Sequence, residues 1–170
     1  MCIFMRYTET NVVFAEVPGE VTLAVNISGC PVRCPGCHSP WLWKDAGTPL
    51  TEDVLLDLVR RADGITCVAL MGGDADPRGV AYLLMAVKDA FPGMKTCWYS
   101  GRDFATAKRY IGPLALDYLK VGPYDEAYGP LDSPSTNQRM YHILRVPGID
   151  DTITFKYEDM TSLFWKNQKS

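Results

Sequence analysis

Short apolar runs along this chain alternate with longer segments in which apolar residues recur every three or four positions. The runs indicate buried strands, and the segments indicate amphipathic helices. We predict strands at 12–17 (an edge strand), 21–27, 65–71, 95–99, 118–121 and 140–146. We predict helices at 51–62, 78–91 and 103–110. Thr51 is expected to be the N-cap of the first helix, because its side chain can accept a hydrogen bond from the first turn.

This order of elements predicts an α/β fold, in which right-handed crossovers join parallel strands. The strands are too few for a closed eight-stranded barrel. We therefore expect an open partial (β/α) barrel with about five or six mostly parallel strands. One domain over residues 1–170 is expected, with a C-terminal extension of unassigned role from about residue 147. Ligands bind such sheets at the carboxyl ends of the strands. Glycine-containing loops follow those ends at 29–37, 72–74, 100–101 and 122–123.

Composition and charge exclude several function classes. Apolar residues make up 47% of the chain and charged residues 22%, both ordinary for a globular protein. A formal net charge of −3 argues against nucleic acid as a partner, because nucleic-acid binding needs clustered Lys and Arg. No apolar run approaches the roughly 20 residues of a membrane span. The start of the chain lacks the basic and apolar pattern of a signal peptide. We expect a cytoplasmic protein that binds neither nucleic acid nor membrane.

Six cysteines are many for a chain of this length, and half of them lie within eight residues. The clustered residues are Cys30, Cys34 and Cys37. The scattered ones are Cys2, Cys67 and Cys97. A secreted disulfide framework would spread its cysteines more evenly through a smaller chain. The cluster therefore indicates metal ligation in a reducing compartment. Cys67 and Cys97 are expected to pack in the core as small apolar residues.

The spacing of the three clustered cysteines is typical of an iron–sulfur site. Three thiolates can hold three irons of a [4Fe–4S] cluster and leave the fourth iron open for a substrate. Pro31, Pro35 and Gly36 suit a loop that wraps a cluster, because they prevent a strand or helix from continuing. The alternative is a structural zinc site with His38 as the fourth ligand. Because His38 directly follows Cys37, both could hardly reach one metal without strain.

Two further motifs follow predicted strands. Gly72, Gly73 and Asp74 end a buried strand, where glycines let the backbone approach a ligand and a carboxylate can hold an ammonium group. Ser100 ends the next strand and is a candidate contact for the same ligand. A plain turn is the alternative at both places.

The cysteine spacing resembles that of the radical S-adenosylmethionine superfamily. The resemblance implies a [4Fe–4S] cluster on Cys30, Cys34 and Cys37, with S-adenosylmethionine bound to the open iron. One electron from the cluster then cleaves S-adenosylmethionine to methionine and a 5′-deoxyadenosyl radical. The resemblance also implies roles for other residues in binding S-adenosylmethionine. Gly73 and Asp74 would contact the methionine amino group, Ser100 the methionine part or the ribose, and the segment of Gly36, Cys37 and His38 the adenine.

Within the superfamily, the chain is similar to the activating protein of the anaerobic ribonucleoside-triphosphate reductase. The similarity runs from about residue 11 to about residue 144. The matching stretches are 25–30, 34–38, 72–74, 98–101, 117–124 and 135–139. Ser39 departs from the asparagine expected there, and Ala75-Asp76 separates Asp74 from Pro77. The resemblance implies an oxidoreductase that generates a glycyl radical on the reductase large subunit, with an electron donor such as flavodoxin.

Two alternatives stay open. One is a small-molecule radical S-adenosylmethionine enzyme such as a 7-carboxy-7-deazaguanine synthase, which would need polar contacts for a heterocycle that the sequence does not reveal. The other is a non-catalytic iron–sulfur or zinc module, which binds metal without cleaving S-adenosylmethionine. The Gly72-Gly73-Asp74 motif counts against the second alternative.

Overall fold

A computed structural model describes residues 5–165 of the chain, so Cys2 lies outside the described residues. The strands are β1 Arg6–Val13, β2 Thr22–Ile27, β3 Thr48–Pro49, β4 Cys67–Met71, β5 Lys95–Tyr99, β6 Tyr118–Val121, β7 Arg139–Pro147 and β8 Ile153–Asp159. The α-helices are α1 Glu52–Arg61, α2 Pro77–Ala90 and α3 Phe104–Tyr110, and the 3-10 helices are η1 Pro40–Trp43, η2 Ile149–Asp151 and η3 Thr161–Phe164. None of the helices in 5–165 is long and apolar enough to cross a membrane.

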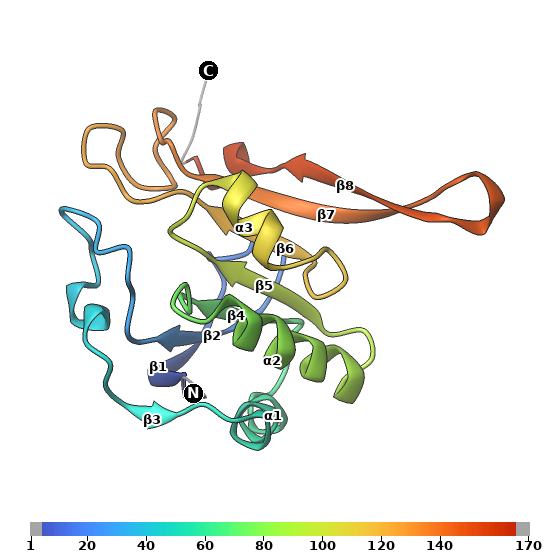
Figure 1. Ribbon diagram of the computed structural model, residues 1–170, viewed down its shortest axis with the longest axis horizontal. Helices are drawn as coiled ribbons and strands as arrows, with labels where there is room; N and C mark the ends of the chain where they lie inside the picture. The colour runs from blue at the N-terminus through green and yellow to red at the C-terminus, as the bar shows by residue number, and fades with distance from the viewer. Residues whose placement is uncertain (1–4, 166–170) are drawn as a thin grey trace.

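All of these strands belong to one mixed sheet, in the order β3-β1-β2-β4-β5-β6-β7-β8 (Figure 1). The central strands β2, β4, β5 and β6 pair in parallel, and the outer pairings on both sides are antiparallel. The predicted α/β class is confirmed. The expectation of five or six mostly parallel strands in a partial barrel is corrected, because the eight strands form an open sheet in which antiparallel pairs are the majority.

The outer strands differ most from the prediction. The first strand spans Arg6–Val13 and not 12–17, because its backbone pairs with both β2 and β3 although its residues are mostly polar. The segment after residue 147 contributes β8, which pairs with β7 from Ile153 to Asp159. The two strands form a long arm that projects beyond the helices (Figure 1). Most side chains of β8 are exposed, and this explains why no apolar pattern indicated a strand there.

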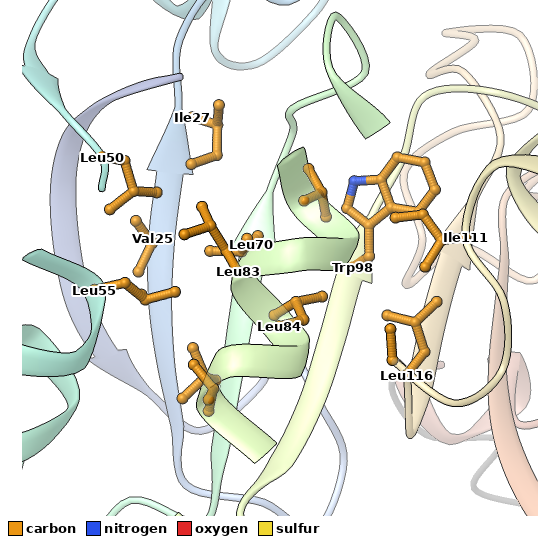
Figure 2. Close-up of a cluster of buried hydrophobic side chains, with 14 of the residues drawn as sticks. Val25, Ile27, Leu50, Leu55, Leu70, Leu83, Leu84, Trp98, Ile111 and Leu116 are labelled. Atoms are coloured by element: carbon orange, nitrogen blue, oxygen red, sulfur yellow. The ribbon is translucent and has the colours of Figure 1, made fainter. Parts of the chain in front are cut away.

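The main core lies between the central strands and the helices. Leu83 and Leu84 of α2 lie against the strands that carry Val25 and Leu70, and Trp98 of β5 lies beside Ile111, as Figure 2 shows. The predicted cap of α1 is confirmed, since the side chain of Thr51 accepts a hydrogen bond from the backbone N–H of Val54. A smaller cluster, which includes Cys67 and Cys97, covers the opposite face of the sheet.

We expect Leu84→Ala to lower the free energy of unfolding by about 2–5 kcal/mol, because Leu84 is fully buried and its loss leaves a cavity. Met85→Ala is the matched control on the next position of α2, where the side chain is 36% exposed and the expected loss is about 0.5 kcal/mol or less. Chemical denaturation monitored by circular dichroism measures both values. Equal losses in the two variants would contradict this description of the core.

Candidate functional site

The carboxyl ends of the four parallel strands border a cleft of about 380 Å³. Its floor is one row of residues that are register partners across the sheet. Asn26 of β2 lies opposite Met71 of β4, Met71 opposite Tyr99 of β5, and Tyr99 opposite Lys120 of β6. All four residues line the cleft. The loops that follow these strands form its walls, as expected for an α/β sheet.

The loop after β2 brings Cys30, Cys34 and Cys37 to the cleft as free, half-buried thiols. The backbone N–H of Cys30 donates to the carbonyl oxygen of Leu42 at 2.9 Å, which ties the start of the loop to η1. The backbone N–H of Cys37 donates to the carbonyl oxygen of Cys34 at 3.1 Å, which closes a turn between the two ligand candidates. The loop therefore holds its three thiols on one wall of the cleft.

Two features of this loop fit a bound iron–sulfur cluster. The backbone N–H of Ser39 donates to Cys37 Sγ at 3.4 Å, and such hydrogen bonds to sulfur tune iron–sulfur clusters. The indole N–H of Trp43, which lines the cleft, is buried and has no hydrogen-bond partner among the described residues. Buried donors are normally paired, so this N–H lacks an acceptor that the described residues do not supply.

Within residues 5–165, no three His, Cys, Asp or Glu side chains are grouped so that they could hold one metal ion. A [4Fe–4S] cluster does not need such a group, because its cysteine ligands bind separate irons. His38, the fourth ligand in the zinc alternative, is exposed at the rim of the cleft. Its ring lies against the ring of Tyr124, with centroids 4.8 Å apart.

Asp74 and Ser100, from the loops after β4 and β5, form a buried pair in the cleft. Ser100 Oγ donates to Asp74 Oδ1 at 2.5 Å, and the backbone N–H of Gly101 donates to Asp74 Oδ2 at 3.0 Å. Arg102 Nε lies 3.8 Å from Asp74 Oδ1. Because a carboxylate offers about four acceptor positions, Asp74 keeps a free position for a ligand. The side chain of Ser100 thus acts on Asp74, an arrangement that the sequence did not indicate.

The candidate glycines lie at different depths. Gly73 is buried and does not line the cleft, and a Cβ atom there would meet Val80 Cγ2 of α2 at 2.5 Å. Gly72 lines the cleft instead, and its φ of +108° is accessible mainly to glycine. Gly36 also has a positive φ, and a Cβ atom there would lie 3.4 Å from Tyr124 Cε1. Gly36, His38 and Tyr124 therefore lie together at one rim.

We expect Ser100→Ala to lower the free energy of unfolding by about 1–3 kcal/mol, because the buried Asp74 carboxylate loses a hydrogen-bond donor. The control is Ser133→Ala, which removes an exposed hydroxyl and should cost about 0.5 kcal/mol or less. Chemical denaturation of both variants gives the comparison. If Ser100→Ala were as stable as the control, the pair with Asp74 would not hold the site together.

Sequence reasoning missed two polar groups of the cleft. The side chain of Lys120 is buried beneath the cleft, and its Nζ donates to the carbonyl oxygen of Gly122 at 2.9 Å. Gln138 Nε2 donates to the same oxygen at 3.2 Å. A signal for both was available, because each lies in a stretch that resembles the activating protein, 117–124 or 135–139.

Cys67 and Cys97 lie outside the cleft and are fully buried, which confirms their predicted place in the core. Burial raises the pKa of both thiols.

Comparisons with known proteins agree with the chemistry of the cysteine loop. Residues 17–139 match the family described as a 4Fe-4S single cluster domain. The chain is also similar to the 7-carboxy-7-deazaguanine synthase of Rhodopirellula baltica, with 34% identity over 77 residues. That match covers 44% of this chain and only 30% of the relative's length. No solved structure matches the chain.

Proposed function

The chain belongs to the family of 4Fe-4S single cluster domains, and on this premise we propose that it is a radical S-adenosylmethionine enzyme. The observation that carries the proposal is one cleft that holds both parts of such a site. Cys30, Cys34 and Cys37 line one wall, and the buried Asp74–Ser100 pair lines another. Three thiolates would hold three irons of the cluster and leave the fourth for a substrate.

When bound and reduced, the cluster supplies the electron that cleaves S-adenosylmethionine to methionine and a 5′-deoxyadenosyl radical. The chain's own residues bind and orient the reactants. The free acceptor position of Asp74 would receive the methionine ammonium in a charge-assisted hydrogen bond. The rings of His38 and Tyr124 offer the adenine an aromatic surface beside the backbone of Gly36. Gly72 lines the cleft at the end of β4, where the lack of a side chain lets the backbone approach a ligand.

We propose a protein as the substrate, namely a backbone glycine of the large subunit of the anaerobic ribonucleoside-triphosphate reductase. The size of the cleft supports this choice. A cleft of about 380 Å³ lies near the lower end of ligand sites, roughly 300–1,000 Å³, and must already take the cluster and S-adenosylmethionine. The group that loses the hydrogen atom would therefore reach the cleft from outside, as an extended peptide can. Flavodoxin or a similar protein would supply the electron, in a reducing cytoplasm.

Two of the stretches that resemble the activating protein, 117–124 and 135–139, support the same choice by their position. Gln138 Nε2 donates to the carbonyl oxygen of Gly122, and Asn137 Nδ2 donates to the carbonyl oxygen of Pro123 at 3.1 Å. These bonds join 135–139 to 117–124 beside the cleft, which Gly122 and Gln138 line. Residues by which the chain resembles the activating protein thus border the cleft, which supports the proposal that the cleft acts on the activating protein's substrate.

A small-molecule substrate is the second candidate, and the similarity to the 7-carboxy-7-deazaguanine synthase favours it. A substrate of that class would bind beside S-adenosylmethionine and would need donors and acceptors for a heterocycle. Gln138 and Asn26 line the cleft and offer such groups.

Electron paramagnetic resonance of the reductase distinguishes the two candidates. The chain is reconstituted with iron and sulfide under anaerobic conditions, reduced, and mixed with S-adenosylmethionine and the reductase. We expect a glycyl radical signal on the reductase, which is absent when the Cys34→Ala variant replaces the native chain. Formation of 5′-deoxyadenosine without that signal would contradict the activase proposal and favour the small-molecule candidate.

A further inference from the structure

Lys120 is a buried cation without an ion pair. Its residue surface is 9% exposed, and no carboxylate lies within 4.0 Å of its Nζ among the described residues. Its ammonium has three donors, of which one is used by the carbonyl oxygen of Gly122. Nζ also lies 6.0 Å from the centroid of the Tyr99 ring. Burial of an isolated charge costs free energy, so we expect an interaction that compensates for the burial of Lys120.

The groups near Lys120 that can carry a negative charge and act on it most belong to the cleft. They are the Asp74 carboxylate and the three cysteines of the loop after β2. The charge of Asp74 is partly balanced without Lys120, because Arg102 Nε lies 3.8 Å from Asp74 Oδ1 and Ser100 and Gly101 donate to the same carboxylate. A cluster held by three thiolates would add negative charge on the cysteine side of the cleft, where Lys120 could balance it.

Lys120 remains largely protonated near neutral pH. Burial lowers its pKa to about 8, and the nearby Asp74 and cysteines act in the opposite direction and raise it. Its position is also fixed, because β6 pairs with β5 on one side and β7 on the other. A fixed charge close to a redox centre acts on that centre's potential, because charge and burial are among the factors that set iron–sulfur potentials.

We propose that the buried ammonium of Lys120 raises the reduction potential of a cluster held by Cys30, Cys34 and Cys37. The inference rests on the proposed function only for the ligation of the cluster. Reduction adds one negative charge to the cluster, and a nearby buried ammonium stabilises the reduced form more than the oxidised form. Lys120 thereby makes the electron transfer that precedes cleavage easier, without contact with the reacting atoms.

The test is a redox titration of the reconstituted protein, followed by electron paramagnetic resonance, without S-adenosylmethionine or reductase. We expect Lys120→Met to lower the ratio of reduced to oxidised cluster at a fixed potential about tenfold to a hundredfold. This change corresponds to ~60–120 mV at about 59 mV per tenfold for one electron. Lys120→Arg keeps the charge and should stay close to the native potential. Lys108→Met is the control, because it removes an exposed lysine outside the cleft.

Iron and sulfide contents, measured before each titration, keep the outcomes distinct. If Lys120→Met fails to load a cluster while Lys120→Arg loads one at the native potential, the charge is needed to assemble the cluster and not to set its potential, which overturns the proposal. Failure of both variants to load would overturn it and make Lys120 a structural residue. A native potential in Lys120→Met, with weaker binding of S-adenosylmethionine, would overturn it as well and assign Lys120 to that ligand. A native chain that holds no cluster would overturn the proposed function itself.

Discussion

Replacement of Cys34 by alanine is expected to abolish cluster binding. Cys34 lies between the other two cysteines in the loop after β2 and lines the same cleft. Its loss leaves two thiolates for four irons, too few to hold a cluster with one open iron. Changes to residues behind metal ligands reduce metal affinity about tenfold to a hundredfold, and loss of a ligand should exceed this. The iron and sulfide contents of the reconstituted protein measure the effect.

Cys97→Ala is the matched control for that prediction. Cys97 is fully buried in the smaller cluster on the opposite face of the sheet and does not line the cleft. We expect this variant to bind iron and sulfide like the native chain. Native iron content in Cys34→Ala, or an equal loss in both variants, would contradict the assignment of Cys34 as a ligand.

Asp74→Asn is expected to weaken the binding of S-adenosylmethionine about tenfold to a hundredfold. A hydrogen bond between a carboxylate and an ammonium contributes about 1.5–3 kcal/mol, and about 1.4 kcal/mol is a factor of ten in affinity. Asparagine keeps the shape of Asp74 and can still accept from Gly101, so the loop should keep its conformation. Anaerobic titration calorimetry of the cluster-loaded protein measures the dissociation constant.

Asp76→Asn, two residues further along, is the control for Asp74→Asn. The Asp76 side chain accepts from the backbone N–H of Gly79 and caps α2. Asparagine is as good an N-cap, so neither stability nor affinity should change appreciably. An affinity for S-adenosylmethionine that is the same in Asp74→Asn as in the control would remove Asp74 from the binding site.

The central sheet and the cysteine loop were predictable because their signals are local. A nearly continuous apolar run identified β4, as expected for a strand buried on both faces. The spacing of the three cysteines is enough to indicate an iron–sulfur site. The hairpin strand β8 was not predictable, because backbone pairing with β7 holds it while most of its side chains stay exposed.

Which side chains meet in the cleft could not be predicted from the sequence, because it depends on the register of neighbouring strands. Ser100 and Asp74 lie 26 residues apart in the sequence, and only the parallel pairing of β4 and β5 brings them together. Lys120 is the one charged residue of the short strand β6, and its lysine side chain gives no indication by itself of which groups it faces. Its place in the row with Tyr99 and Met71 follows from the register of β4, β5 and β6.

The most direct test of radical S-adenosylmethionine chemistry is the formation of 5′-deoxyadenosine. The chain is reconstituted with iron and sulfide, reduced with dithionite under anaerobic conditions, and incubated with S-adenosylmethionine in the presence of the reductase. We predict 5′-deoxyadenosine and methionine in equal amounts from the native chain, and neither from Cys34→Ala. A native chain that carries a full cluster and yields no 5′-deoxyadenosine would contradict the account and leave a non-catalytic iron–sulfur module.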